Sequence, residues 1–165
     1  MARPATAETK RFQMLGHDFA VRTTRDLAEH IDRTFSTLRV PGRPAHHYDL
    51  DAVEGERSEV WSLRYDGHVL MEGPSVGACY SHLCWHINRE AIDRCDDLLL
   101  LHSACAATAD GRGVLLPAAM ESGKSTTVAG LVRAGMHYLT DEATAIEPAT
   151  GGLRSCAKPL SIDPG

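Results

Sequence analysis

A helical repeat of apolar positions marks the first element that the sequence predicts. Leu27, Ile31 and Phe35 recur every four positions and predict a helix over residues 23–38. Thr24 is of a residue type that caps helix starts, which supports a beginning at this point.

The segments on either side of this helix carry no periodic pattern. Residues 1–10 are small and polar and are expected to form an unstructured tail. Residues 39–49 are rich in proline and glycine and are expected to be a connection, in which His46 and His47 are solvated.

A hairpin and a second helix are expected next. Residues 59–73 form two β-prone runs around Asp66-Gly67, a dipeptide that favours the positive φ angles of a tight hairpin turn. A helix over residues 76–94 follows, because its apolar residues fall on one stripe at spacings of three and four: Val76, Tyr80, Leu83, Ile87 and Ala91.

From residue 98 the pattern changes to short, strongly apolar runs. Residues 98–107 are almost wholly apolar, as is typical of a strand that is covered on both faces. The pattern then predicts a turn at 110–113, a strand at 114–117, a helix at 123–134 stopped by Gly135, and strands at 136–140 and 144–147.

Size and charge limit the possible partners. The 165 residues suit one domain, or a small domain plus part of another, and 43% hydrophobic residues can supply a core. A net charge of −5 argues against a nucleic-acid partner. Without a long apolar run or a signal-like N-terminus, no membrane partner and a cytoplasmic location are expected. The five cysteines are then expected to be reduced thiols.

The segment PAAMESGKSTTV, residues 117–128, ends in the Gly-Lys-Ser of a phosphate-binding loop. The usual motif is G-x-x-x-x-G-K-[ST], but Ala118 replaces its first glycine and Glu121 puts a carboxylate inside the loop. A strand before the loop and a helix after it would aim backbone N–H groups at a phosphate. Nucleotide-binding residues are therefore predicted at Ser122, Gly123, Lys124, Ser125 and Thr126. The alternative is a surface loop with an accidental match.

In this motif, Lys124 would reach the β- and γ-phosphates and Ser125 would join Mg²⁺. The predicted strand 136–140 leads into Asp141 and Glu142, where P-loop enzymes place a metal- or water-orienting carboxylate. Since neighbouring side chains of a strand alternate, one acid would serve as base while the other supports the metal. The alternative is a solvated pair of acids. His102 is either a core residue or a catalytic one.

Together these patterns predict an α/β fold. A small α+β segment over residues 1–96 would precede, over residues 97–165, the opening units of a P-loop nucleotide-binding core. The sheet of such a partial core would have unpaired edges, which favour self-association into a homo-oligomer.

The stretch from residue 98 to residue 148 resembles the catalytic core of the HPr kinase/phosphorylase-like family of bacterial serine kinases. The resemblance lies in the order of an apolar strand with a histidine, a hairpin, a phosphate loop, a helix ending near Ala134-Gly135, and a strand closing on paired acids. It covers roughly 50 of the 165 residues. Relatives continue beyond the position of Gly165, so the chain is C-terminally short by comparison.

The resemblance implies an ATP- and Mg²⁺-dependent kinase that phosphorylates a serine hydroxyl of a protein or peptide. Asp141 would match the catalytic acid that takes the serine proton, and Glu142 would lie close to the metal with Ser125. His102 matches a histidine near the site, followed by Ser103 where the family has glycine.

Two other functions stay open. The altered loop favours a non-catalytic or degenerate nucleotide-binding module with a regulatory or scaffolding role, and a structural fragment without a ligand is a weaker alternative. A metal site at Cys79, His82 and His86, which share one flank of a predicted helix, is also possible, although a polar flank with semi-buried cysteines explains the pattern as well.

Overall fold

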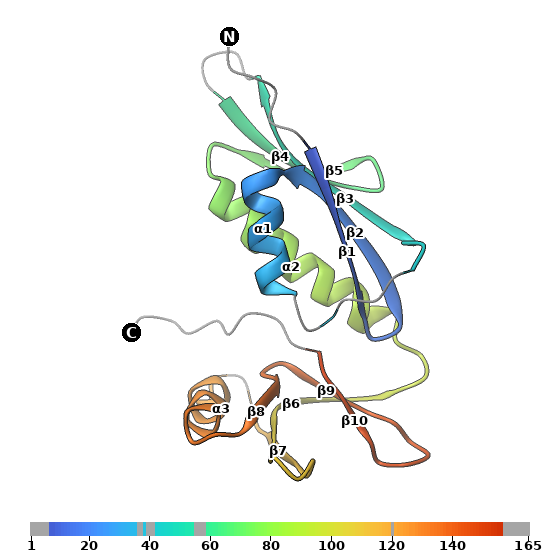
Figure 1. Cartoon of the computed structure of the whole chain (residues 1–165), viewed down its shortest axis with the longest axis vertical. Coiled ribbons are helices and arrows are strands. Elements are labelled where there is room, and N and C mark those ends of the chain that lie inside the picture. Colours follow the sequence, from blue (N-terminus) through green and yellow to red (C-terminus); the bar gives the residue numbers. More distant parts are fainter. Residues whose placement is uncertain (1–6, 36–37, 39–41, 55–58, 120, 157–165) are drawn as a thin grey trace. The chain divides into compact units, whose positions relative to one another are not determined.

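The chain forms a mixed α/β structure with more strand than helix. The computed structural model describes residues 7–35, 38, 42–54, 59–119 and 121–156, and within these it contains three helices and two five-stranded sheets. The chain divides into two compact units, Met1–Asp93 and Arg94–Gly165, each with its own sheet (Figure 1). The sequence places the corresponding boundary near residue 96.

The first unit is a five-stranded sheet with two helices. Its strands lie in chain order: β1 (Ala7–Met14), β2 (His17–Thr24), β3 (His46–Glu54), β4 (Glu59–Tyr65) and β5 (His68–Gly73). Only the β2–β3 pair is parallel, because the chain crosses from the end of β2 through α1 (Arg25–Thr34) before it re-enters the sheet. The second helix, α2 (Val76–Asp93), follows β5.

Both helices pack on the same face of this sheet, α1 on β1 and β2, and α2 on β4 and β5 (Figure 1). The core between them is aromatic and aliphatic; its largest fully buried side chains include Phe19, Ile31, Tyr48, Leu50, Leu63, Leu83 and Ile87. Phe12 of β1 stacks on Phe35 at the end of α1, with ring centroids 4.3 Å apart. This stacking attaches α1 to the edge of the sheet.

Elements with a strong local signal form where the sequence predicts them. The hairpin turn adopts positive φ at both Asp66 (45°) and Gly67 (84°). Leu83, Ile87 and Ala91 of the predicted α2 stripe are buried. Val76 and Tyr80, which the stripe also included, are half-exposed, and Cys79 is buried in the first turn instead. Helix α2 is therefore confirmed, and so is α1, which begins directly after Thr24 although the Thr24 side chain makes no capping bond.

Three strands of the first unit contradict the expectations from sequence or were not predicted. Residues 7–10, expected in a tail, belong to β1, and β2 follows it through a turn with positive φ at Leu15 and Gly16. Leu-Gly lacks the Asn or Asp that marks such turns in a sequence. His46, expected to be solvated, is 8% exposed in β3, whereas His47 is exposed as predicted. Pairing with both β2 and β4 specifies β3, and no local pattern shows that pairing.

A network of tyrosine and histidine side chains joins α2 to the sheet. The Tyr48 hydroxyl lies 2.8 Å from Nδ1 of His86, and the Tyr65 hydroxyl donates to Oε2 of Glu90 at 2.8 Å. Because the single hydroxyl proton of Tyr65 is used there, Nδ1 of His46, 2.8 Å from the same oxygen, acts as a donor. The helix is thus fixed by directed polar contacts as well as by apolar packing.

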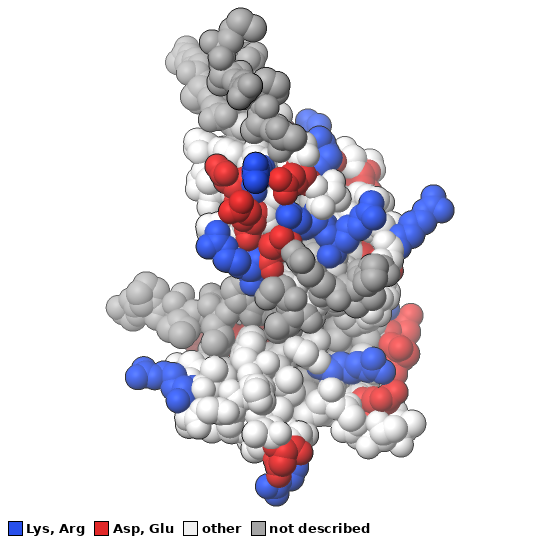
Figure 2. All heavy atoms as spheres, in the orientation of Figure 1, with Lys and Arg blue, Asp and Glu red and all other residues white. Residues whose placement is uncertain are grey.

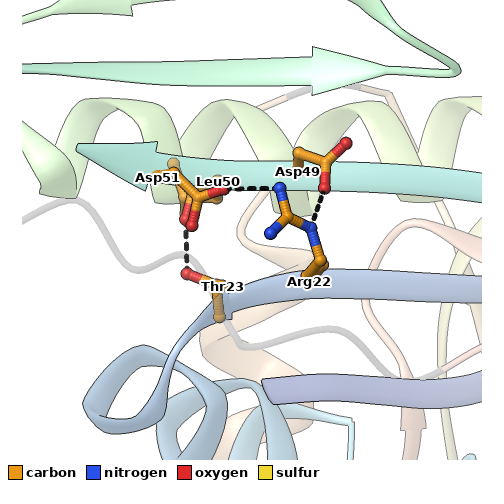
Figure 3. A network of polar contacts seen from close by, with 5 residues as sticks. All are labelled: Arg22, Thr23, Asp49, Leu50 and Asp51. Carbon is orange, nitrogen blue, oxygen red and sulfur yellow. Dashed lines mark hydrogen bonds and ion pairs between the residues drawn. The ribbon is translucent and has the colours of Figure 1, made fainter. Parts of the chain in front are cut away.

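The opposite face of this sheet carries exposed charges. The Arg22 guanidinium of β2 bonds to Asp49 at 2.6 Å and to Asp51 at 3.1 Å, both on β3 (Figure 3). Directly beneath, the buried Thr23 hydroxyl donates to the carbonyl oxygen of Leu50 at 2.5 Å (Figure 3). Acidic and basic side chains intermingle over the visible face of this unit (Figure 2), so the charges on that face are mixed rather than segregated by sign.

The second unit is built around one long strand, β6 (Leu99–Ala107). On one side β6 pairs first with β9 (Ala143–Ile146) and then with β8 (His137–Thr140); on the other side its second half pairs with β7 (Gly113–Pro117). All these pairs are antiparallel, and β10 (Leu153–Arg154) adds to β9. Helix α3 (Lys124–Arg133) packs on β6 and β8 (Figure 1).

Small side chains allow α3 to approach this sheet closely. Ala104 and Ala106 of β6 are fully buried against Val128 of α3. Gly135 follows α3 with φ of 97°, which confirms it as the helix stop. A methyl group on Gly113 would lie only 2.0 Å from Cδ1 of Leu153, so a larger residue there requires the Leu153 side chain to move.

The expectation that β6 is covered on both faces is wrong for its first half. Leu99 is 60% exposed, Leu101 is 37% exposed, and His102 is exposed, whereas the residues from Ser103 to Ala106 are fully buried. The apolar run reads continuously, but α3 and β7 extend only along its second half. Apolar composition alone does not show how far its covering elements extend.

The environment of His86 makes the first unit sensitive to acid. Burial lowers the pKa of His86 below its ordinary value; Glu90 opposes this shift and His82 adds to it. In the tautomer in which Nδ1 of His86 accepts from the Tyr48 hydroxyl, protonation also removes that acceptor. The stability that depends on neutral His86 is present above about pH 6.5, the ordinary value, and is lost as pH falls toward the lower pKa of the folded state.

We therefore expect the melting temperature of the first unit to fall between pH 7.5 and 5.5, and the fall to be smaller in His86→Asn. Fluorescence of Trp61 and Trp85, both in this unit, reports its unfolding. The matched control is His47→Asn on the exposed side of β3, which should leave the fall unchanged. An equal fall in the His86 variant and the wild type contradicts the assignment.

Candidate functional site

The segment between β7 and α3 has the backbone form of an anion-binding loop. The N-cap of α3, Gly123, has a left-handed φ of 85°, and Glu121 two residues earlier has φ of 61°. Alternating conformations of this kind turn successive N–H groups toward one side. Because Ala118 is not among the described residues with positive φ, its methyl group fits where the motif usually has glycine.

No side chain caps the start of α3, so its first N–H groups are available to a ligand. Ser122 and Thr126 are exposed beside them, and the Thr127 hydroxyl donates to the carbonyl oxygen of Gly123 at 3.0 Å. The predicted phosphate-binding residues 122–126 thus lie together at the beginning of one helix.

Lys124 lies across the loop that precedes it. Its Nζ donates to the carbonyl oxygens of Ala118, at 2.9 Å, and Ala119, at 2.6 Å. These two acceptors are neutral and exposed, so a phosphate oxygen that carries negative charge can replace them with a net gain. The ammonium group is held close to the loop without a fixed partner of opposite charge among these contacts.

A carboxylate held by two hydroxyl groups connects α3 to the end of β8. Asp141, which follows β8 and is 7% exposed, accepts a bond from the Ser125 hydroxyl at Oδ2 (3.0 Å) and from the Tyr138 hydroxyl at Oδ1 (2.9 Å). Ser125 lies in the first turn of α3 and Tyr138 in the middle of β8. The predicted metal-side serine and the predicted catalytic acid are therefore in direct contact.

Tyr138 is a site residue that the sequence analysis missed. Its hydroxyl is a donor only while it is protonated, and burial, followed by the charge of Asp141, holds its pKa well above the ordinary value. It therefore stays a donor at any physiological pH. The available signal was its position three residues before Asp141, but in a strand of mostly apolar residues it reads as core.

The other two predicted residues are Glu142, which follows Asp141 directly in the chain, and His102 of β6. The Thr140 hydroxyl accepts from the backbone N–H groups of Glu142 (3.2 Å) and Ala143 (3.3 Å), which shapes the bend that follows Asp141. Glu142 is half-buried. His102 pairs in register with Ala143, and strand alternation puts its side chain on the face of β6 that also carries Ala104 and α3.

Ser103, which stands next to His102 where the resembled family has glycine, has a structural role. Ser103, fully buried, lies 2.6 Å from the Thr144 hydroxyl across the β6–β9 pair. This pair of hydroxyl groups adds a side-chain contact to the backbone pairing of the two strands.

The cysteine and histidine cluster of α2 does not form a metal site. Cys79 is fully buried with its thiol directed at the carbonyl oxygen of Trp61, and Nδ1 of His86 is bonded to Tyr48. In the part of the chain that the structure describes, no three His, Cys, Asp or Glu side chains are grouped to hold an ion. Cys79 is thus fully buried rather than semi-buried as the alternative explanation expected.

Comparison of the chain with known protein families, with characterised proteins and with solved structures finds no match. None of the helices in the described ranges is long and apolar enough to span a membrane.

The bond from Tyr138 to Asp141 is expected to stabilise the second unit. Tyr138→Phe keeps the ring but removes a donor to a nearly buried carboxylate, which should lower the free energy of unfolding by about 1–3 kcal/mol. Hydrogen exchange of the β8 amides measures this loss. In the background of Asp141→Asn the loss should be smaller, since the charged acceptor is gone; an equal loss in both backgrounds contradicts a stabilising bond.

Proposed function

We propose that the chain is an ATP-dependent kinase that phosphorylates a serine hydroxyl of a protein or peptide, in the manner of the HPr kinase-like family that its second half resembles. The observation that carries this proposal is the 3.0 Å bond from Ser125 to Asp141. It pairs the serine of a Gly-Lys-Ser helix start with an acid at the end of a neighbouring strand, which is the relation that Mg-nucleotide sites of P-loop enzymes require.

The residues present suit a Mg-nucleotide. The Ser125 hydroxyl and the Glu142 carboxylate are hard oxygen donors of the kind that Mg²⁺ prefers, and Asp141, directly before Glu142 in the chain, is left as the base. Lys124 and the uncapped N–H groups of α3 supply the positive partners for phosphate. A bound Mg²⁺ ion would offset the negative charge of the phosphates.

In the proposed transfer, the bond between the γ-phosphorus and the β–γ bridging oxygen breaks while a bond to the serine oxygen forms, and the serine proton goes to a carboxylate. Asp141 is the proposed acceptor. Oδ1 stays bonded to Tyr138, and Oδ2 becomes available when the Ser125 hydroxyl turns away from it. Tyr138 thus determines which oxygen of Asp141 accepts the proton. His102 is proposed to lie near the reacting serine.

A second candidate is a non-catalytic nucleotide-binding module, and the backbone at Glu121 favours it. A left-handed φ in a residue other than glycine costs about 1–2 kcal/mol. The residue also brings a carboxylate into the loop, where it repels phosphate. The carboxylate weakens binding and the strain lowers the stability of the loop, and a module that senses nucleotide needs no fast turnover.

Nucleotide binding is expected to depend on Lys124. Lys124→Ala should weaken binding of a fluorescent ATP analogue with Mg²⁺ by at least about tenfold, because a charge-assisted bond to phosphate is lost. Arg133→Ala is the matched control, since it removes one exposed positive charge at the other end of α3. Binding that is equally strong in all three proteins contradicts a phosphate site at this loop.

Asp141→Asn separates the two functions. It should retain nucleotide binding within a few-fold while it abolishes transfer of phosphate to a serine peptide, which phosphate incorporation measures. Glu142→Gln should reduce transfer less. If Glu142→Gln abolishes transfer and Asp141→Asn does not, the two acids have exchanged roles; if the wild type binds nucleotide but transfers to no peptide, the module is the better description.

Glu121 allows charge and backbone strain to be tested separately. Glu121→Gln removes the charge only, whereas Glu121→Gly also relieves the left-handed backbone. We expect both to tighten nucleotide binding to a similar extent, because both remove the charge, and only the glycine variant to raise the melting temperature. Weaker binding in Glu121→Gln would instead mean that the carboxylate contributes to the site.

A further inference from the structure

One edge of β6 is open beside the candidate phosphate loop. On its β7 side, β6 is paired from Ala107 to Ser103, where Pro117 is the last partner. There the chain leaves β7 and turns into the loop. Leu99–His102 pair with β9 on one side, and on the β7 side they pair with no strand of the described chain.

The hydrogen-bonding groups on this edge can be assigned. The Thr144 hydroxyl of β9 donates to the carbonyl oxygen of Ser103 at 3.4 Å, so the backbone polar groups of Ser103 face β9. The pairing of Ser103 with Pro117, which has no N–H to donate, agrees with this. Because these groups alternate along a strand, those of Leu100 and His102 face the open edge.

The side chains of the edge are apolar and exposed. Leu99 (60%) and Leu101 (37%) project from the face opposite α3, because Ala104 and Ala106, of even number, face the helix. His102 lies on the α3 face, at the end of the edge that is closest to the loop. A strand placed here would satisfy the open backbone groups and cover both leucines.

We propose that residues 99–102 of β6 form the docking edge for the serine-bearing peptide, which adds as a strand antiparallel to β6 and in line with β7. This inference rests on the proposed kinase function. In this register the amino-terminal residue of the bound strand lies opposite His102, beside the loop, so the reacting serine is at that end of the docked segment. Backbone bonds provide the affinity, and apolar side chains on alternate residues provide the selectivity.

The size of the edge favours a short peptide over a second copy of the chain. Four residues of strand span about 13 Å, whereas stable protein interfaces bury at least about 1,000 Å². An edge of this length gives weak, reversible binding, which suits a substrate that must leave after reaction.

Two sets of measurements on the full chain test the docking edge. A short fluorescein-labelled peptide, with a serine near its amino end followed by alternating valine and threonine, is titrated against nucleotide-free protein and followed by anisotropy. We expect saturable binding that weakens at least tenfold in Leu99→Lys/Leu101→Lys, since charged side chains block edge pairing. The matched control is Val69→Lys, an exposed strand position of the first unit, which should bind as the wild type does. Hydrogen exchange should show the amides of Leu100 and His102 unprotected alone and protected with peptide.

Each other outcome overturns the inference. Absence of peptide binding, equal binding in the double variant, or protection of both amides in the free chain would mean that the edge is not a docking site. A change of sedimentation from dimer to monomer in the double variant would assign the edge to a second copy. Loss of nucleotide binding in Lys124→Ala is measured separately. A chain that binds nucleotide but not peptide refutes the docking edge and leaves the proposed nucleotide site standing. A chain that binds peptide but not nucleotide refutes the proposed kinase.

Discussion

The second unit depends on one buried negative charge and the two hydroxyl groups that hold it. A carboxylate as little exposed as that of Asp141 is stable only with hydrogen-bond donors, and Ser125 and Tyr138 occupy one oxygen each. One donor comes from the first turn of α3 and the other from β8, so the bonds fix the helix start against the strand end. The position of the loop before α3 follows from that attachment.

The loop itself combines favourable and unfavourable backbone features. Gly123 adopts its left-handed conformation at no cost, whereas Glu121 adopts a similar one against the preference of its side chain. Lys124 donates to carbonyl groups of the loop, and because these acceptors are neutral the contact is readily reversed. The chain thus keeps the geometry of an anion site while its intrinsic affinity is lowered, a combination that suits either a slow kinase or a nucleotide sensor.

The interior of each unit is stabilised by different contacts. In the first, aromatic rings stack between sheet and helices, and tyrosine hydroxyls such as those of Tyr48 and Tyr65 bond to α2. In the second, alanine residues permit close approach of α3, and the Ser103–Thr144 hydroxyl pair joins two strands. Large buried rings tolerate polar partners at their edges, whereas a small-residue core depends on close backbone contact.

The sequence by itself determined the elements whose signal is local: the Asp66-Gly67 hairpin, the helices, the Gly135 stop and the helix start at Gly-Lys-Ser. Only the tertiary structure decided β1, β2, β3 and β10. β3 pairs with β2 across the intervening α1, whereas β1 and β10 each pair with the strand beside them in the chain through a turn that has no Asp-Gly or Asn-Gly signal. It also decided that Tyr138 bonds to Asp141 and that the first half of β6 is exposed. Periodicity reports which face of an element is apolar, but only packing determines what covers that face and how far.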